Sequence, residues 1–285
     1  MDLCNINHIK PLLSRHGFHF SKSMGQNFLT ASWVPDRICA EAGIDEQTGV
    51  LEVGPGIGCL TVRLAASAGK VVAVELDRAL EPVLEETLAD CENAAVIFGD
   101  ILKMDIEGMV KQHMTGLNPV VCANLPYNIT SPVISALIES GCFDSMTLMV
   151  QREVARRICA KAGTADYGAF TVYCGWYADS RILFDVPPEC FVPQPKVWSS
   201  VIKMTVRKSP PVMVKNEKLF FDVVRAAFAQ RRKTLANALS SGIPGCSKEA
   251  AGKILSDCGF SDKVRGEELD VCGFASVADR ISEIL

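Results

Sequence analysis

The chain has 285 residues, of which 48% are hydrophobic and 22% are charged, and its formal net charge is −4. This balance is that of an ordinary globular protein and excludes a disordered, collagen-like or coiled-coil chain. Apolar runs stay far below the roughly 18 residues of a membrane helix, and no secretory-type apolar stretch marks the N-terminus, so we expect a cytoplasmic protein with one large domain or a large and a small one.

The first half of the chain alternates short apolar runs with helical patterns. Residues 50–53 predict a strand that ends at a glycine-rich turn, and a helix follows it. Further strands are expected at 70–75, 95–98, 119–123 and 146–150, with helices at 80–88 and 131–140. Strands that alternate with helices predict an α/β fold whose mostly parallel sheet is covered on both faces.

The remainder of the chain has a different pattern. Residues 168–206 are aromatic, β-branched and punctuated by proline, which predicts antiparallel edge strands that close the sheet. The run 207–211 is the best linker candidate, and beyond it apolar residues recur four apart, as they do in helices. We therefore expect an α/β domain of residues 1–208 and a small helical domain of residues 209–285.

Twelve cysteines and four histidines are scattered without the spacing of a metal site. No two cysteines lie closer than twelve residues, so the sequence contains no Cys-x-x-Cys pair. Most of the cysteines stand in apolar segments, which is typical of small buried side chains. We expect reduced thiols and no bound metal.

A glycine-rich turn and two acidic residues mark the ends of three successive strands. Gly54, Gly56 and Gly58 form a Gly-x-Gly-x-Gly pattern, which differs from the Gly-x-Gly-x-x-Gly of dinucleotide enzymes. Glu75 can accept both hydrogen bonds of a ribose diol, and Asp100 can accept a hydrogen bond from an adenine amino group. Each acid alone could also be a helix cap or a loop charge. Together these residues favour a nucleoside cofactor without phosphates, a description that S-adenosylmethionine fits.

The tetrapeptide Asn124-Leu125-Pro126-Tyr127 follows the fourth strand. The exocyclic amine of adenine is a poor nucleophile, because its lone pair is delocalised into the ring. The Asn124 side-chain carbonyl and the Leu125 backbone carbonyl can accept its two N–H groups and align the nitrogen with a methyl donor. Pro126 fixes the turn, and Tyr127 can stack on the base. Such a tetrapeptide is also common turn chemistry, but the glycine motif upstream favours the catalytic interpretation.

Charge is distributed unevenly along the chain. Residues 1–200 carry 15 basic and 23 acidic side chains, whereas residues 201–285 carry 14 basic and 10 acidic ones. Two basic clusters could face phosphates, although each could equally be a solvated surface. They consist of Arg152, Arg156 and Arg157, and of Arg231, Arg232 and Lys233.

Several motifs together resemble the ribosomal RNA adenine dimethyltransferase family. Besides the glycine-rich turn and the tetrapeptide, the similar segments are 22–29, 150–155, 191–197 and 228–235. Ser23 and Met24 depart from the pattern, since many members have a basic or larger residue followed by Leu or Phe there. The resemblance implies a Rossmann-like class I S-adenosylmethionine-dependent methyltransferase domain, followed by a small helical C-terminal domain.

The resemblance also implies an activity and roles for particular residues. Family members dimethylate the 6-amino group of two adjacent adenosines in a hairpin near the 3′ end of small-subunit ribosomal RNA, and they take part in small-subunit biogenesis. Residues 1–30 would cover the cofactor, the C-terminal domain would bind RNA, and both basic clusters would bind phosphates. Phe191 would sandwich the target base with Tyr127. The expected cofactor contacts are Asn27, Leu29, Gly54, Gly56, Glu75, Asp100 and Asn124.

Three alternatives stay open at this point. Large-subunit methyltransferases that confer macrolide resistance usually have Ile in place of Leu125 and are more basic overall. An adenine-specific DNA methyltransferase would carry a target-recognition insertion, which is not evident here. A chain that acts chiefly as an assembly checkpoint would bind precursors of the small ribosomal subunit, with methylation secondary. We expect a monomer whose partner is the small ribosomal subunit.

Overall fold

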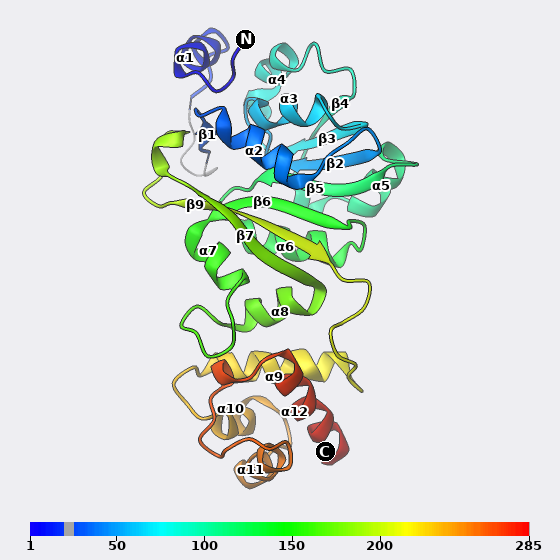
Figure 1. The fold of residues 1–285 in the computed structure, drawn as a ribbon, viewed down its shortest axis with the longest axis vertical. Coiled ribbons are helices and arrows are strands. Elements are labelled where there is room, and N and C mark those ends of the chain that lie inside the picture. Colours follow the sequence, from blue (N-terminus) through cyan, green and yellow to red (C-terminus); the bar gives the residue numbers. More distant parts are fainter. Residues whose placement is uncertain (20–25, 285) are drawn as a thin grey trace. The chain divides into compact units, whose positions relative to one another are not determined.

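The structure is a computed structural model, which describes residues 1–19 and 26–284 (Figure 1). The chain forms two compact units: residues 1–155 with 181–206, and residues 156–180 with 207–285. The boundary expected at 208 lies beside the last change of unit, between residues 206 and 207. Residues 156–180, which the sequence pattern placed in the α/β domain, group instead with the C-terminal helices.

A seven-stranded sheet forms the centre of the first unit. The five strands predicted in the first half of the chain are all present and run parallel, and β9 pairs antiparallel with β6. A separate antiparallel ladder joins β1 (Phe28–Leu29) to β8 (Phe191–Val192). The order across the main sheet is β4 (Ala94–Phe98), β3 (Lys70–Glu75), β2 (Thr48–Val53), β5 (Asn118–Asn124), β6 (Ser145–Gln151), β9 (Ser199–Val206) and β7 (Ala178–Val186).

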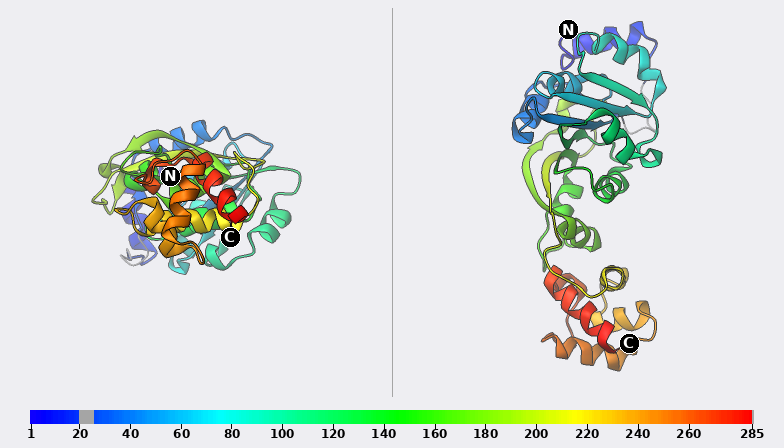
Figure 2. Two further views of the ribbon diagram at one scale, coloured as in Figure 1. Left: turned by 90° about the horizontal axis from the view of Figure 1, so that it is seen from below. Right: turned by 90° about the vertical axis from the view of Figure 1, so that its right-hand side faces the viewer.

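Helices cover both faces of this sheet, with α2 and α3 on one side and α5 and α6 on the other (Figure 2). The core beneath the first group contains Ile38, Leu64 and Val71, all fully buried. The sequence pattern predicted this two-sided burial from continuous apolar strands. The helices of this unit are α1 (Ile6–Arg15), α2 (Trp33–Ala42), α3 (Cys59–Ala65), α4 (Glu81–Thr87), α5 (Ile106–His113) and α6 (Thr130–Glu139), with short 3₁₀ turns η2 (Arg78–Leu80), η3 (Ile101–Lys103) and η4 (Pro188–Cys190).

The strand order reverses between β2 and β5, and this reversal determines where a ligand can bind. The chain builds β2, β3 and β4 in one direction and then returns to place β5 on the other side of β2. Ligands of open α/β sheets bind outside the carboxyl ends of the strands at such a point. Val53 lies opposite Val74, and Glu75 lies opposite Phe98, so the turns after these strands open on one edge.

The second unit is helical, and its first helix corrects the sequence analysis. Residues 169–177 form a helix, α8 (Ala169–Tyr177), although an edge strand was expected there. Trp176 of α8 is buried and stacks on Phe220, with ring centroids 4.3 Å apart. Aromatic composition favoured a strand, but packing against a partner distant in sequence decided the conformation. The other elements are α7 (Arg152–Ile158), whose residues are divided between the two units, α9 (Glu217–Ala229), α10 (Leu235–Gly242), α11 (Lys248–Asp257), η5 (Gly266–Glu268) and α12 (Val271–Ile284).

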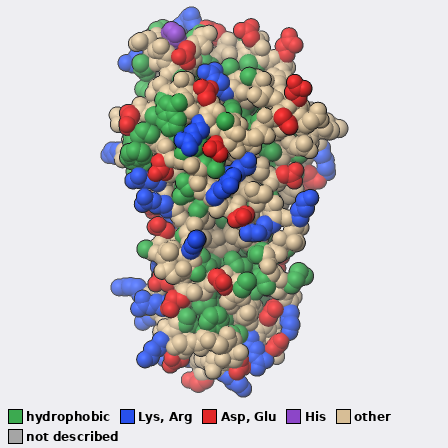
Figure 3. Space-filling model, in the orientation of Figure 1, with side chains coloured by type: hydrophobic (Ala, Val, Ile, Leu, Met, Phe, Trp, Pro, Cys, Tyr) green, Lys and Arg blue, Asp and Glu red, His purple; other side chains and the backbone are tan. Residues whose placement is uncertain are grey.

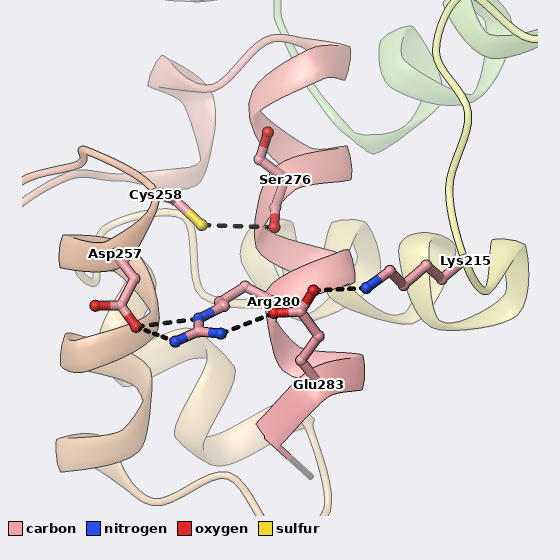
Figure 4. A network of polar contacts seen from close by, with 6 residues as sticks. All are labelled: Lys215, Asp257, Cys258, Ser276, Arg280 and Glu283. Carbon is pink, nitrogen blue, oxygen red and sulfur yellow. Dashed lines mark hydrogen bonds and ion pairs between the residues drawn. The ribbon is translucent and has the colours of Figure 1, made fainter.

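A chain of opposite charges joins the last two helices of the second unit to the segment before α9 (Figure 4). Arg280 of α12 donates to Asp257 of α11 and to Glu283, each at 2.7 Å. Glu283 also accepts a hydrogen bond from Lys215 at 2.5 Å. These side chains are partly exposed, and such pairs add little to stability because solvent screens the charges. The network therefore fixes the positions of these elements more than it stabilises the unit.

Candidate functional site

A pocket open to solvent lies at the carboxyl ends of β2, β3, β4 and β5, where the strand order reverses. Its empty volume, including the open mouth, is about 1070 Å³, which is ample for a nucleoside-sized ligand. Residues from distant parts of the sequence converge on it. Of the predicted cofactor-binding and catalytic residues, the pocket is lined by Asn27, Leu29, Gly54, Gly56, Glu75, Asp100, Asn124, Leu125, Pro126 and Tyr127.

The turn after β2 lines the pocket with glycine residues, which have no side chain. Gly54 and Gly56 have φ angles of 72° and 61°, a region that favours glycine. A Cβ atom on Gly56 would lie 3.1 Å from the ring of Phe28, which belongs to the β1 wall of the same pocket. The Gly54 N–H donates to the Val74 carbonyl at 2.9 Å and holds the turn against β3. A ligand can therefore approach this backbone closely.

The Glu75 carboxylate connects two walls of the pocket. One oxygen accepts from the Gly56 N–H at 3.2 Å, and the other accepts from the Asp77 N–H at 2.9 Å. Each carboxylate oxygen keeps a further lone pair for a ligand hydroxyl. Burial raises the pKa of Glu75, and these backbone hydrogen bonds oppose the rise. Asp77 in turn accepts from the Gln26 side chain at 2.7 Å, which ties the N-terminal wall to the same turn.

Replacing Glu75 with alanine should raise the Kd for S-adenosylhomocysteine about 100-fold, because two hydrogen bonds to a carboxylate would be lost. Isothermal titration calorimetry of the purified protein measures this change. Glu92→Ala removes an exposed carboxylate near the start of β4 and should leave the Kd unchanged. Equal Kd values for the wild type and Glu75→Ala would contradict the prediction that Glu75 accepts the hydrogen bonds of a ribose diol.

Asp100 caps a turn, which is one of the two functions that the sequence left open, and it also lines the pocket. Its carboxylate accepts from the Leu102 N–H at 3.1 Å and so caps the turn η3. It also pairs with Lys103 at 3.3 Å and lines the pocket. Capping holds the carboxylate at the pocket wall, where it can accept a ligand amino group.

Asn124 has a defined orientation at the end of β5. Its Nδ2 donates to the Asn27 carbonyl at 3.3 Å, across 97 residues of sequence. Because the amide nitrogen is turned toward the Asn27 carbonyl, the amide oxygen can act as an acceptor toward the pocket. The following Leu125 N–H donates to the Met149 carbonyl at 3.0 Å, so the backbone of the tetrapeptide is anchored to β6.

Pro126 and Tyr127 complete this wall. The Pro126 ring lies 3.6 Å from the position of a Cβ on Gly54, so the tetrapeptide and the glycine-rich turn face each other closely. The Tyr127 hydroxyl is 2.6 Å from the Ser199 hydroxyl of β9, which restrains the ring. Burial raises the pKa of Tyr127, and the Ser199 hydrogen bond opposes the rise. Tyr127 therefore acts as a neutral aromatic surface at neutral pH.

Glu52, two residues before the glycine-rich turn, lines the site, although the sequence analysis gave it no role. Its side chain is 1% exposed within β2 and also lines the pocket. Its Oε2 has no hydrogen-bond partner among the described residues. Burial raises the pKa of Glu52 to about 8, with the Thr61 hydroxyl opposing the rise. The sequence feature that could have identified Glu52 is an acidic residue within an otherwise apolar strand.

Phe191 is the predicted catalytic residue that does not line the pocket. It lies in β8, opposite Leu29, and is only 4% exposed. Other pocket residues were missed because they have no chemical signature of their own, including Leu76 and Ile101, which follow the acids at two strand ends. Lys22 to Gly25 of the N-terminal motif lie outside the described residues, whereas Gln26 to Leu29 line the pocket.

The six predicted RNA-binding residues are divided between the two units. Arg152 belongs to the first unit, and its guanidinium lies over the Trp198 ring. Arg156 and Arg157 are exposed in the second unit, as are Arg232 and Lys233. Arg231 has structural contacts, because it pairs with Glu267 at 3.0 Å and donates to the carbonyls of Ala165 and Tyr167. Basic and acidic side chains alternate over the face seen in Figure 3 and form no single basic field there.

Because of these contacts, we expect the substitution of Arg231 to have a different effect from the substitution of Arg232 and Lys233. Arg232→Ala combined with Lys233→Ala should reduce the slope of log K against log salt by about 1.5, because two phosphate contacts would be lost. Arg231→Ala should instead lower the melting temperature, since it frees the 165–167 turn. Filter binding to small ribosomal subunits over a salt series and thermal melting measure the two effects. An unchanged slope in the double variant would exclude these phosphate contacts.

The described residues carry neither a membrane-crossing helix nor a metal site. Within 1–19 and 26–284, no helix is both long and apolar enough to span a bilayer. In the same ranges, no group of three or more His, Cys, Asp or Glu side chains is arranged to hold a metal ion. The twelve cysteines have free thiols in the structure, and Cys59 contributes to the pocket wall.

The reversed parallel sheet, with a glycine-rich turn and an Asn-Leu-Pro-Tyr turn facing one pocket, defines a Rossmann-like methyltransferase. A dimethyladenosine transferase from Plasmodium falciparum has the same fold, with a TM-score of 0.72 and 27% identity, covering 87% of this chain and 95% of that one. The 23S rRNA methyltransferase ErmE also shares the fold, with a TM-score of 0.69 and 24% identity over 90% of this chain and 99% of that one.

The chain belongs to the ribosomal RNA adenine dimethylase family, whose model matches residues 17–275. Ribosomal RNA small subunit methyltransferase A of Bacillus licheniformis is 44% identical over 281 residues, covering 97% of this chain and 96% of that protein. The protein of the same name from Lachnoclostridium phytofermentans is 45% identical over 276 residues and covers 95% of each chain. The match therefore extends across both compact units.

Proposed function

We propose that this protein dimethylates the 6-amino group of two adjacent adenosines in a hairpin near the 3′ end of small-subunit ribosomal RNA, with S-adenosylmethionine as methyl donor, and that it takes part in small-subunit biogenesis. The orientation of Asn124 supports the proposal, because its Nδ2 is held by the Asn27 carbonyl in the pocket wall and its amide oxygen can act as an acceptor there. Membership of the ribosomal RNA adenine dimethylase family and the relatives named small subunit methyltransferase A support the substrate.

The pocket fits S-adenosylmethionine by its chemistry. Glu75 keeps acceptor capacity for a ribose diol, and Asp100 for an adenine amino group. The buried Oε2 of Glu52 lacks a partner among the described residues and can accept from an ammonium group. The glycine-rich turn provides backbone close to the ligand. The cofactor, when bound, supplies an electrophilic methyl group on a sulfonium.

The tetrapeptide prepares the acceptor nitrogen. The Asn124 amide oxygen and the Leu125 carbonyl would each accept one N–H of the adenine amine, which directs its lone pair toward the methyl group. Tyr127, restrained by Ser199, would stack on the base and keep it in this orientation. No strong base is required, because the nitrogen becomes acidic only after the methyl group has been transferred.

Recognition of the RNA would require both a target base that is turned out of its stack and contacts to the phosphates around it. An adenine amine has to leave its stack to reach the pocket. Exposed basic residues such as Arg156, Arg157, Arg232 and Lys233 would bind phosphates around the target. We place the protein in the cytoplasm as a monomer, with the small ribosomal subunit as its partner.

Methyl transfer from labelled S-adenosylmethionine tests this function. The acceptors are small subunits from a strain that lacks the modification, with large subunits and duplex DNA in parallel, and the products are analysed for dimethyladenosine. Label in small subunits alone, as dimethyladenosine, is the expected result. Label in large subunits would indicate the resistance type of enzyme. Cofactor binding without label in any acceptor would favour an assembly checkpoint.

A further inference from the structure

The segment between β8 and β9 exposes apolar and basic side chains beside the pocket. Residues 193–198 begin where the β1–β8 ladder ends and lead directly into β9. Val197 and Trp198 are 44% and 41% exposed, although both are large and apolar. Lys196 is exposed as well. Adjacent exposed apolar side chains at a functional site indicate an interaction surface.

Trp198 is connected to the catalytic wall through its neighbour in sequence. Ser199 is fully buried, and its hydroxyl is 2.6 Å from the hydroxyl of Tyr127. Ser199 is the first residue of β9 and is buried beside Tyr127, whereas Trp198, which precedes the strand, is 41% exposed. The indole therefore stands outside the pocket, one residue away from the contact that restrains its aromatic wall.

Arg152 orients the indole and adds positive charge. Its guanidinium carbon lies 5.2 Å from the Trp198 ring centroid, and its backbone N–H donates to the Trp198 carbonyl at 2.9 Å. Trp198 as a residue stays 41% exposed with Arg152 in place. Lys196 provides a second cation nearby in sequence, whereas Glu153 is the acidic neighbour of Arg152. Aromatic rings and guanidinium planes are the surfaces on which unpaired RNA bases stack.

We propose that Trp198 and Arg152 form a stacking site for an unpaired RNA base that neighbours the adenosine in the pocket. The site deepens the proposed function, on which it rests, because it reads the nucleotides around the target and takes no part in methyl transfer. The two cations favour a polyanion as the occupant, and the link through Ser199 places the site next to the base-binding wall.

Steady-state kinetics on unmodified small subunits test the site. Trp198→Leu should raise the KM for subunits about tenfold, while kcat and the Kd for S-adenosylhomocysteine stay unchanged. Trp198→Phe, which keeps an aromatic ring, should recover most of this loss. Ile182→Ala removes an equally exposed apolar side chain from β7 and should behave as wild type. An unchanged KM in Trp198→Leu, or equal impairment in the Leu and Phe variants, would overturn the proposal.

Photo-crosslinking identifies the occupant independently of catalysis. Trp198→p-benzoylphenylalanine, irradiated with the same subunits, should crosslink to a ribosomal RNA nucleotide beside the methylated adenosines, and the same replacement at Ile182 should not. A crosslink to a ribosomal protein, or none, would overturn the stacking site while wild-type methylation still upheld the enzyme function. A crosslink to RNA without wild-type methylation would instead overturn the enzyme function and retain the site.

Discussion

Replacing Asn124 with alanine will lower kcat for methyl transfer about a thousandfold, the largest effect that we expect from a single substitution in the pocket. The variant loses the amide oxygen that would accept an N–H of the adenine amine, so the nitrogen lone pair is no longer aligned with the methyl group. It also loses the hydrogen bond from Nδ2 to the Asn27 carbonyl, which should weaken cofactor binding without abolishing it. Single-turnover methylation of small subunits and calorimetry with S-adenosylhomocysteine measure the two effects.

Two further variants test whether the loss of turnover comes from the loss of the Asn124 side-chain amide. Asn118→Ala removes an exposed asparagine at the opposite end of β5 and should keep wild-type turnover. Asn124→Asp retains an acceptor but turns a carboxylate oxygen toward the Asn27 carbonyl, so its rate should lie between those of Asn124→Ala and the wild type. A wild-type rate in Asn124→Ala would refute the assigned role.

Replacing Glu52 with glutamine will make the protein more stable at alkaline pH. The folded-state pKa of Glu52 is raised from 4.5 to about 8, so between these values the unfolded chain is ionised while the folded chain remains protonated. The unfolded state then binds fewer protons, and the free energy of unfolding falls as pH rises through this interval. At about 1.4 kcal/mol per pKa unit the loss reaches at most about 5 kcal/mol near pH 8. The glutamine variant has no such loss.

Urea unfolding of the cofactor-free protein at several values between pH 5 and pH 8.5 measures this difference. The free energies of unfolding of the wild type and Glu52→Gln should diverge as pH rises and become parallel above about pH 8. Glu46→Gln changes an exposed carboxylate just before β2 and should follow the wild type. Parallel curves over the whole range would show that Glu52 ionises in the folded state as readily as in the unfolded one.

The parts of the fold that the sequence predicted are those with local signals. An apolar run followed by Gly54, Asp100 or Asn124 identifies both a strand and the site residue at its carboxyl end. Because parallel strands share one edge, these strand ends converge without any knowledge of long-range contacts. The pocket wall was predictable for this reason, and the structure brings those residues together.

The parts that the sequence did not predict depend on partners far along the chain. Helix α8 forms where Trp176 meets Phe220, although its composition favours a strand. In the sequence, Arg231 is one of three adjacent basic residues and nothing distinguishes it from the other two. In the structure, contact with Glu267 gives it a structural role. The buried state of Phe191 follows from its pairing with Leu29, and no pattern around residue 191 indicates that pairing.

The short ladder between β1 and β8 gives the proposed enzyme a thermodynamic property. Leu29 lines the pocket, and its partner Phe191 leads into the segment that carries Trp198. Because the two strands are hydrogen-bonded, a ligand that depends on the position of one strand also depends on the position of the other, so under the proposed function the two binding free energies would be coupled. Such coupling is reciprocal: RNA must tighten the cofactor by the same factor by which the cofactor tightens RNA, whichever of them binds first.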